Sequence, residues 1–190
     1  MWINIKKKIL ENYFLITNSI ENMIRQIIIK FTNYLPVKVI KDDNKIPFLY
    51  RYHVFAFTDN GPGICIHHFV NSDPDRGFHD HPWSHSLSFI LAGGYEERLD
   101  KENPDKIGRK VSRWSFNYLN GKKTFHRVML PKNEDAWTIF FFTKRSKTWG
   151  FWKRNNDELV YKQMAKNIHD DDAGWWKTAP KGHMIKKTIN

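Results

Sequence analysis

The residues with the clearest capacity for chemistry are three histidines, two of which stand two positions apart. His79 and His81 lie in the segment FHDHPW. Residues two apart in an extended chain share a face and lie about 6.6 Å apart along it, so both imidazoles can reach one ion. A firmly held ion needs a further ligand, and we expect it to be His126, which opens another β-like run. The sequence therefore predicts a divalent-metal site on His79, His81 and His126.

The alternative is that these histidines lie in turns or on the surface, where they bond to the backbone, because a single His-x-His pair is common by chance. The order of elements favours the metal site. The pair is followed by a β-like run, a glycine turn, a second hairpin and then the third histidine.

This order resembles the cupin superfamily, whose first motif is HxH, three or four residues, Glu, six residues and Gly. His79 and His81 match the histidines, Gly93 matches the glycine, and the glutamate position falls on Ser86. His126 represents the second motif without its usual proline and asparagine. The resemblance covers about residues 50–150 and implies a mainly β fold, an antiparallel double-stranded β-helix (the cupin or jelly-roll barrel).

Several strings are similar to those of small cupin-like proteins of phages, large viruses and bacteria. They are SDPDRGFHDHPW, ILAGGYEE, HRV and WGFW. This narrower resemblance implies a viral or bacterial origin. It supports the expected fold more strongly than it supports the expected function. If the protein is viral, it would act in the host cytoplasm or the virion.

The serine at position 86 changes the expected chemistry of the ion. Three neutral imidazoles leave a dication its full charge, which favours an anionic co-ligand or hydroxide at an open position. Thiol dioxygenases of the cupin superfamily have a similar three-histidine shell for ferrous iron, so the resemblance favours Fe²⁺. Imidazole ligands also suit Zn²⁺, Mn²⁺ or Ni²⁺. His85 or Asp80 could add a fourth ligand, but alternation points Asp80 away from His79 and His81.

Three further residues are candidates for contact with a substrate. Trp83 is close to the ligands in sequence. Either His67 or His68 must face the barrel interior, and we expect His68 because it shares a face with two isoleucines; the alternative is a core histidine. Arg127 could bind a carboxylate or phosphate through two parallel hydrogen bonds. Alternatively, it is a solvated charge on the surface.

The pattern around these residues predicts a single domain with two extensions. Residues 1–47 form an N-terminal helical extension, 48–154 the cupin β-barrel, and 155–190 a helical or irregular tail with a short helix over Asp157–Ile168. Short β-branched and aromatic runs separated by turn residues favour an antiparallel barrel or sandwich. The expected strands are Leu49–Thr58, Ile64–Val70, Ser84–Leu91, Tyr95–Leu99, Lys110–Phe116, Arg127–Leu130 and Trp137–Thr143.

Residues 1–34 carry apolar side chains at helical spacing, from Ile16 to Phe31. Such a stripe can lie on a membrane surface, but it more often packs on a sheet or on a second copy, and it favours a homodimer. The uncharged run between Glu11 and Glu21 is too short and polar to span a membrane.

Composition favours a cytoplasmic protein. A single cysteine, Cys65, excludes an internal disulfide, and no secretory signal is evident, which indicates a reducing compartment. The net charge of +11 favours an anionic partner. Nucleic acid is the less favoured one, because no recognised nucleic-acid module accompanies the charge and an AT-rich coding sequence also enriches lysine.

We therefore expect a metal-dependent enzyme acting on a small anionic molecule, with Fe(II)-dependent oxygenation, a dioxygenase activity, as the leading chemistry. A metal-dependent isomerase or hydrolase is the second class. A non-catalytic module that binds a sugar or other small molecule is the third, and a basic nucleic-acid accessory protein the fourth.

Overall fold

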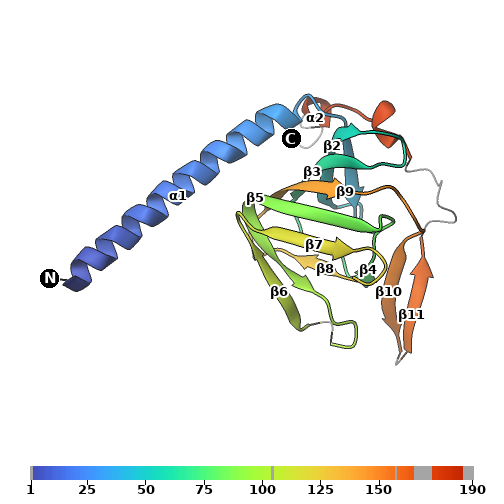
Figure 1. The fold of residues 1–190 in the computed structure, drawn as a ribbon. Helices are drawn as coiled ribbons and strands as arrows, with labels where there is room; N and C mark the ends of the chain where they lie inside the picture. Colours follow the sequence, from blue (N-terminus) through green and yellow to red (C-terminus); the bar gives the residue numbers. More distant parts are fainter. Residues whose placement is uncertain (1, 104, 157, 165–172, 186–190) are drawn as a thin grey trace.

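Antiparallel strands arranged in two layers form the body of the molecule (Figure 1). The computed structural model describes residues 2–103, 105–156, 158–164 and 173–185. The strands are β1 Val37–Lys41, β2 Pro47–Ala56, β3 Gly63–Phe69, β4 Phe78–His79, β5 His85–Arg98, β6 Ile107–Ser112, β7 Phe116–Asn120, β8 Arg127–Met129, β9 Ala136–Phe142, β10 Gly150–Asn155 and β11 Glu158–Gln163.

Strand β5 belongs to both layers. Its first half pairs with β7 and β9, and its second half pairs with β6 and β8. The chain bends at Gly93, where φ is +69° and an added Cβ would lie 2.0 Å from the carbonyl oxygen of Asp135. Only glycine fits there. The turn expected at Gly93-Gly94 is therefore wrong: one 14-residue strand passes through this point from one layer to the other.

The pairing gives the strand order of a jelly roll. One layer runs β1-β2-β3-β9, then the first half of β5, then β7. The other runs β11-β10-β4, joins β8 through the pair His79 and His126, and continues to the second half of β5 and to β6. Double-layered jelly rolls of this kind include the cupins. The predicted antiparallel barrel is confirmed.

Two clusters of buried side chains hold the layers. The first lies between the layers and includes Phe69, Ile90, Tyr95 and Val128. The second lies on the outer face of β2, β3 and β9, where Ile28 of the N-terminal helix packs with Tyr52, Ile66 and Trp137. Strand β3 is therefore buried on both of its faces.

The predicted N-terminal helix is confirmed as α1, Trp2–Thr32. Only its C-terminal part rests on the barrel, and the remainder projects away from it (Figure 1). Glu21 accepts a hydrogen bond from the Gly93 N–H at 2.8 Å and forms an ion pair with Arg113. Arg25 forms an ion pair with Asp135. No helix in the described part of the chain is long and apolar enough to cross a membrane.

The expected strand Lys110–Phe116 is split by a turn. Trp114, at φ +65°, lies in the turn, and β6 and β7 are separate strands on either side of it. Each of them pairs with a different half of β5, which requires the chain to reverse here.

The helix expected over Asp157–Ile168 is wrong where the structure describes it. Residues Glu158–Gln163 form strand β11, which pairs along its length with β10. Strand β1 is likewise an unexpected strand within the extension 1–47. The C-terminal helices are short: η1, Trp175–Lys177, and α2, Gly182–Ile185.

Candidate metal centre

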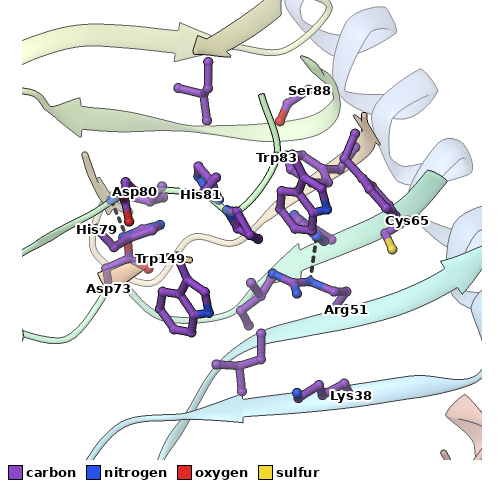
Figure 2. A pocket seen from close by; sticks show the side chains of 18 of the residues that line it. Lys38, Arg51, Cys65, Asp73, His79, Asp80, His81, Trp83, Ser88 and Trp149 are labelled. Atoms are coloured by element: carbon purple, nitrogen blue, oxygen red, sulfur yellow. Dashed lines mark hydrogen bonds and ion pairs between the residues drawn. The ribbon is translucent and has the colours of Figure 1, made fainter. Parts of the chain in front are cut away.

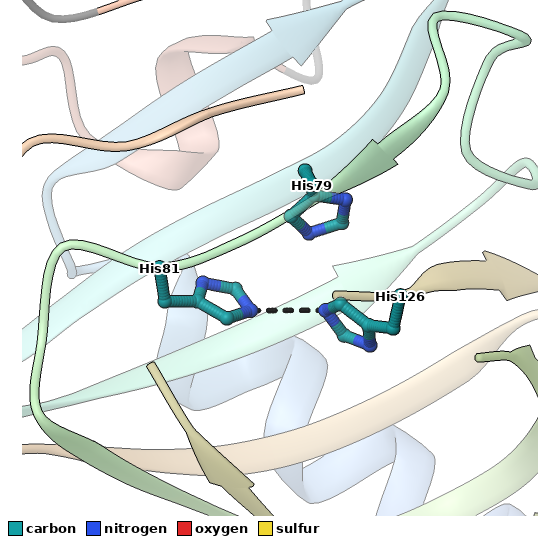
Figure 3. A group of neighbouring side chains, drawn as sticks. All are labelled: His79, His81 and His126. Atoms are coloured by element: carbon teal, nitrogen blue, oxygen red, sulfur yellow. Dashed lines mark hydrogen bonds between the residues drawn. The ribbon is translucent and has the colours of Figure 1, made fainter. Parts of the chain in front are cut away.

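The three predicted histidines meet at one point between the layers (Figure 3). His79 ends β4, His81 follows two residues later, and His126 immediately precedes β8. The backbones of His79 and His126 exchange two N–H···O bonds of 3.0 Å each. This pairing fixes the register that brings the distant histidine beside the other two, and the three imidazoles offer ligand atoms that all lie within 4.8 Å of one another.

The geometry fits a single ion. Nε2 of His81 and Nε2 of His126 are 2.9 Å apart. Two imidazole nitrogens on a tetrahedral ion, each about 2.0–2.1 Å from it, would be about 3.3 Å apart. A ring movement of a few tenths of an ångström therefore suffices to admit the ion. Three protein ligands leave one coordination position open.

The electrostatics also suit metal binding. Burial, followed by the charge of His126, lowers the pKa of both His79 and His81 well below the ordinary value of 6.5. These imidazoles are therefore neutral near pH 7, which is the form that coordinates metals.

A buried carboxylate orients His126. Oε1 of Glu97 lies 2.7 Å from Nδ1 of His126, and the Glu97 side chain has 0% exposure. Asn117 donates to Oε1 at 2.7 Å, and Arg109 forms an ion pair with Oε2. Burial alone would raise the pKa of Glu97, but the hydrogen bond and charge of His126 together with Arg109 lower it to about 2. Glu97 is ionised and holds the proton of His126 on Nδ1, so that Nε2 faces the site.

A second carboxylate lies behind His79. Oδ2 of Asp73 is 3.6 Å from Nδ1 of His79 and accepts the Val128 N–H at 2.8 Å. Asp73 is buried. Asp73 is therefore a second carboxylate close to the histidines, although 3.6 Å is too long for a hydrogen bond.

Neither carboxylate was predicted from the sequence. The cupin motif places its glutamate at position 86, but here that residue is a serine and lies outside the residues that line the cavity. The signal for Glu97 was alternation along β5, since Tyr95 and Glu97 share one face of a buried strand. Tyr95 and Glu97 are joined through Asn117, whose Nδ2 donates to both.

A cavity of about 230 Å³ opens beside the histidines (Figure 2). Trp83, a candidate for substrate contact, lines the cavity, with its ring 5.8 Å from that of His81 and nearly parallel to it. The guanidinium of Arg51 lies 5.7 Å from the centre of the Trp83 ring. The three histidines therefore line the same cavity as an aromatic side chain, Trp83, and a basic one, Arg51.

His68 does not line the cavity; its neighbour His67 does. His68 stacks on Trp137 at 3.7 Å between ring centres and pairs with Asp135 at 2.7 Å. The expected orientation of His68 is wrong because Ile66, on the same face of β3, packs with Ile28 of α1 rather than into the barrel. On the cavity side, Nε2 of His67 accepts a hydrogen bond from Arg51 at 3.2 Å.

Arg127 also lies outside the residues that line the cavity. Its guanidinium binds Asp75 at 2.9 Å and the carbonyl of Asp73 at 3.4 Å, so it supports the loop before β4. Asp80 is not part of the histidine cluster, as alternation predicted, although it borders the cavity. It accepts the Gly150 N–H at 2.7 Å and forms an ion pair with Lys147.

No protein-family model matches this chain, and no curated protein matches it. Solved structures do show partial similarity. A cupin-like protein of unknown function from Ralstonia eutropha has 14% identity and a TM-score of 0.47, over 70% of this chain and 73% of the other. A sugar phosphate isomerase of the cupin superfamily from Silicibacter pomeroyi has 9% identity and a TM-score of 0.45, over 73% and 92%.

Hydroxypropylphosphonic acid epoxidase from S. wedmorenis is also similar, with 13% identity and a TM-score of 0.43. The match covers 56% of this chain and only 55% of the epoxidase. The fold assignment itself follows from the chain's own strands, namely a two-layer jelly roll with the His-x-His pair beside β4 and the third histidine beside β8. By its own strand order, the chain folds as a two-layer antiparallel jelly roll, the architecture that cupins share.

Proposed function

We propose that this protein is a metal-dependent enzyme that acts on a small anionic molecule, with Fe(II)-dependent oxygenation as the leading chemistry. The observation that carries the proposal is the convergence of His79, His81 and His126 beside a cavity. A bound divalent ion would supply Lewis acidity and, if it is iron, redox chemistry with dioxygen. The three-histidine shell favours iron through the resemblance to thiol dioxygenases.

The side chains around the histidines would prepare the site for a substrate. Glu97 would fix the orientation of the His126 imidazole, and Asp73 lies close to that of His79. Trp83, 8% exposed, closes one side of the cavity and excludes water from it. A volume of about 230 Å³ is below the range of about 300–1,000 Å³ typical of drug-sized ligands, which favours a small substrate.

Metal analysis of protein purified without added metal tests the proposal. We expect close to one equivalent of iron, zinc, manganese or nickel in the wild type, and loss of it in His81→Ala and His126→Ala. His85→Ala is the matched control, because His85 is exposed and its Nδ1 pairs with Tyr118 at 2.6 Å. Background metal in the wild type, or loss only in the control, would overturn the proposal.

A redox-neutral enzyme, an isomerase or hydrolase using zinc or manganese, is the second candidate, because neutral imidazoles suit these ions equally well. Oxygen consumption separates the two classes. Iron-loaded protein supplied with small anionic compounds should consume dioxygen if it is an oxygenase. Turnover that continues unchanged without dioxygen would instead identify the redox-neutral class.

A non-catalytic binding module is the third candidate, favoured by the aromatic side chains Trp83 and Trp149 on the cavity wall. Such a module would be stabilised against heat by a sugar or another small ligand that it leaves chemically unchanged.

A further inference from the structure

Helix α1, most of which projects from the barrel (Figure 1), carries a row of exposed apolar side chains. Their exposed fractions run from 41% at Ile20 to 68% at Tyr13. At about 100° of turn per residue, the row lies within an arc of about 80° on one side of the helix. We call these six residues the α1 seam: Ile9, Tyr13, Ile16, Ile20, Met23 and Ile27.

The barrel holds α1 by a different side of the helix. Glu21 forms an ion pair with Arg113, Arg25 forms one with Asp135, and Ile28 packs in the cluster outside β3. On a regular helix, these three helix residues point about 100–160° away from the centre of the α1 seam. None of the six seam residues belongs to either buried cluster of the described chain. The described part of the barrel therefore leaves the seam uncovered.

The composition of α1 requires a packed face. The helix contains no alanine, and nine of the twelve residues from 9 to 20 are isoleucine, asparagine, tyrosine, phenylalanine, threonine or serine. These are weaker helix formers than alanine, leucine or glutamate. Most of the stability of such helices comes from burial of an apolar face rather than from local propensity. The part of α1 that projects from the barrel therefore needs a partner for its apolar row.

The spacing of the row identifies a helix as the partner. Successive seam residues are four, three, four, three and four positions apart. They form two rows at seven-residue intervals, one through Ile9, Ile16 and Met23 and the other through the remaining three. This is the repeat of coiled coils, in which each seam residue inserts between residues of a facing helix with the same spacing.

The positions beside the seam indicate which helix this is. In coiled coils these flanking positions set the choice of partner, often through opposite charges. A partner with charged flanks would gain no ion pair from α1, whereas a second copy of α1 meets no like charge there in either direction of pairing. The flanking residues are all uncharged: Leu10, Asn12, Thr17, Ser19, Ile24 and Gln26.

The charges of this stretch do not suit a membrane surface. A helix that lies on a membrane carries lysine and arginine along its polar face, where they attract anionic lipids. From residue 9 to residue 24 the chain has no lysine or arginine and two glutamates, Glu11 and Glu21. A second protein helix therefore fits the seam better than a lipid surface does.

We infer that the α1 seam packs against the α1 seam of a second copy of this chain. The inference is independent of the candidate metal centre, because none of the six seam residues lines the cavity. The assembly joins two barrels through their N-terminal helices.

Size-exclusion chromatography with light scattering, on the full chain at micromolar concentration, tests the inference. The wild type should have at least twice the mass of one chain, 22.8 kDa. Ile16→Glu combined with Ile20→Glu should have the mass of one chain. The matched control is Leu15→Glu combined with Asn22→Glu, which adds the same two charges at exposed positions off the seam and should keep the wild-type mass.

A milder pair of changes serves if the glutamate variant does not fold. Ile16→Ala combined with Ile20→Ala keeps a strong helix former at both positions. It should weaken self-association by about tenfold or more, because apolar surface is lost from the seam of each copy. Thermal unfolding of the barrel and metal content should match the wild type in every folded variant, which separates this inference from the proposal for the metal site.

Three results would each overturn the inference. One is a wild type with the mass of a single chain, including one that sediments with vesicles of phosphatidylcholine and phosphatidylglycerol. The second is an assembly that survives in both the glutamate and the alanine seam variants. The third is an assembly that the control pair, Leu15→Glu with Asn22→Glu, disrupts to the same extent as the seam variants do.

Discussion

Glu97 and His126 are joined by a hydrogen bond of 2.7 Å between Oε1 and Nδ1, in a part of the barrel where Glu97 has no exposure to solvent. The same imidazole presents Nε2 to Nε2 of His81 at 2.9 Å. The carboxylate thus determines which nitrogen of His126 is available to an ion. Through this hydrogen bond, the buried face of the second half of β5 supports the candidate metal centre.

Glu97→Gln should weaken metal binding by about 10- to 100-fold, since loss of such an orienting carboxylate has effects of this size in metalloproteins. The side chain keeps its shape but loses the charge that holds the proton of His126 on Nδ1. Competition with a chromophoric chelator, using zinc or cobalt, measures the change. Glu96→Gln is the control, because Glu96 points to the other face of β5 and pairs with Lys110. Equal affinities for Glu97→Gln and the wild type would contradict the assigned role.

Asp80→Ala should destabilise the fold by about 3 kcal/mol, because it removes a buried partner of Lys147 and of the Gly150 N–H and leaves these groups unsatisfied. Urea unfolding measures the free energy of unfolding. The control is Asp75→Ala, whose carboxylate is 83% exposed and pairs with Arg127. That change should cost less than about 1 kcal/mol. If both variants cost the same, Asp80 does not hold β10 to the histidine segment.

Cys65 should be unreactive in the native state. Burial raises the pKa of its thiol to about 12. Near pH 8, only about one such thiol in ten thousand is ionised, and the thiolate is the reactive form. Labelling with Ellman's reagent should therefore be slow in native protein and complete within minutes in urea. Rapid native labelling would show that the cavity wall at β3 opens readily.

Lys38 should make the stability of the fold depend on pH. Burial, followed by the charges of Arg51 and Arg145, lowers its pKa from 10.5 to about 8 in the folded protein. The unfolded chain therefore binds more protons between about pH 8 and pH 10.5, so the free energy of unfolding should rise with pH through this window. Urea unfolding of the wild type and of Lys38→Met at several pH values measures the effect, and the rise should be smaller in the variant. An equal pH dependence of the two proteins would contradict the lowered pKa.

Much of the candidate site could be predicted from the sequence because its determinants are local. The spacing of His79 and His81 sets their common face in any extended chain, and the same alternation turns Asp80 away. The turn at Asn120-Gly121 placed His126 at the start of the strand that meets them. The helical spacing of residues 1–34 likewise predicted α1 within two residues at either end.

The remaining features depend on what packs on each face, which a single sequence does not reveal. Which of His67 and His68 faces the cavity could be decided only by knowing that α1 covers the outer face of β3. Arg127 binds a loop aspartate 52 residues away in the chain. β11 is a strand because β10 offers it a free edge, and this tertiary pairing overrides the local helical preference.

The central claim is that three imidazoles hold one ion, and anomalous diffraction at the absorption edge of the metal tests it most directly. Crystals of the full chain grown with iron, zinc or manganese should show one strong peak, within about 2.0–2.3 Å of a nitrogen from each of His79, His81 and His126. A peak elsewhere, or rings that point to separate places around no peak, would contradict the account.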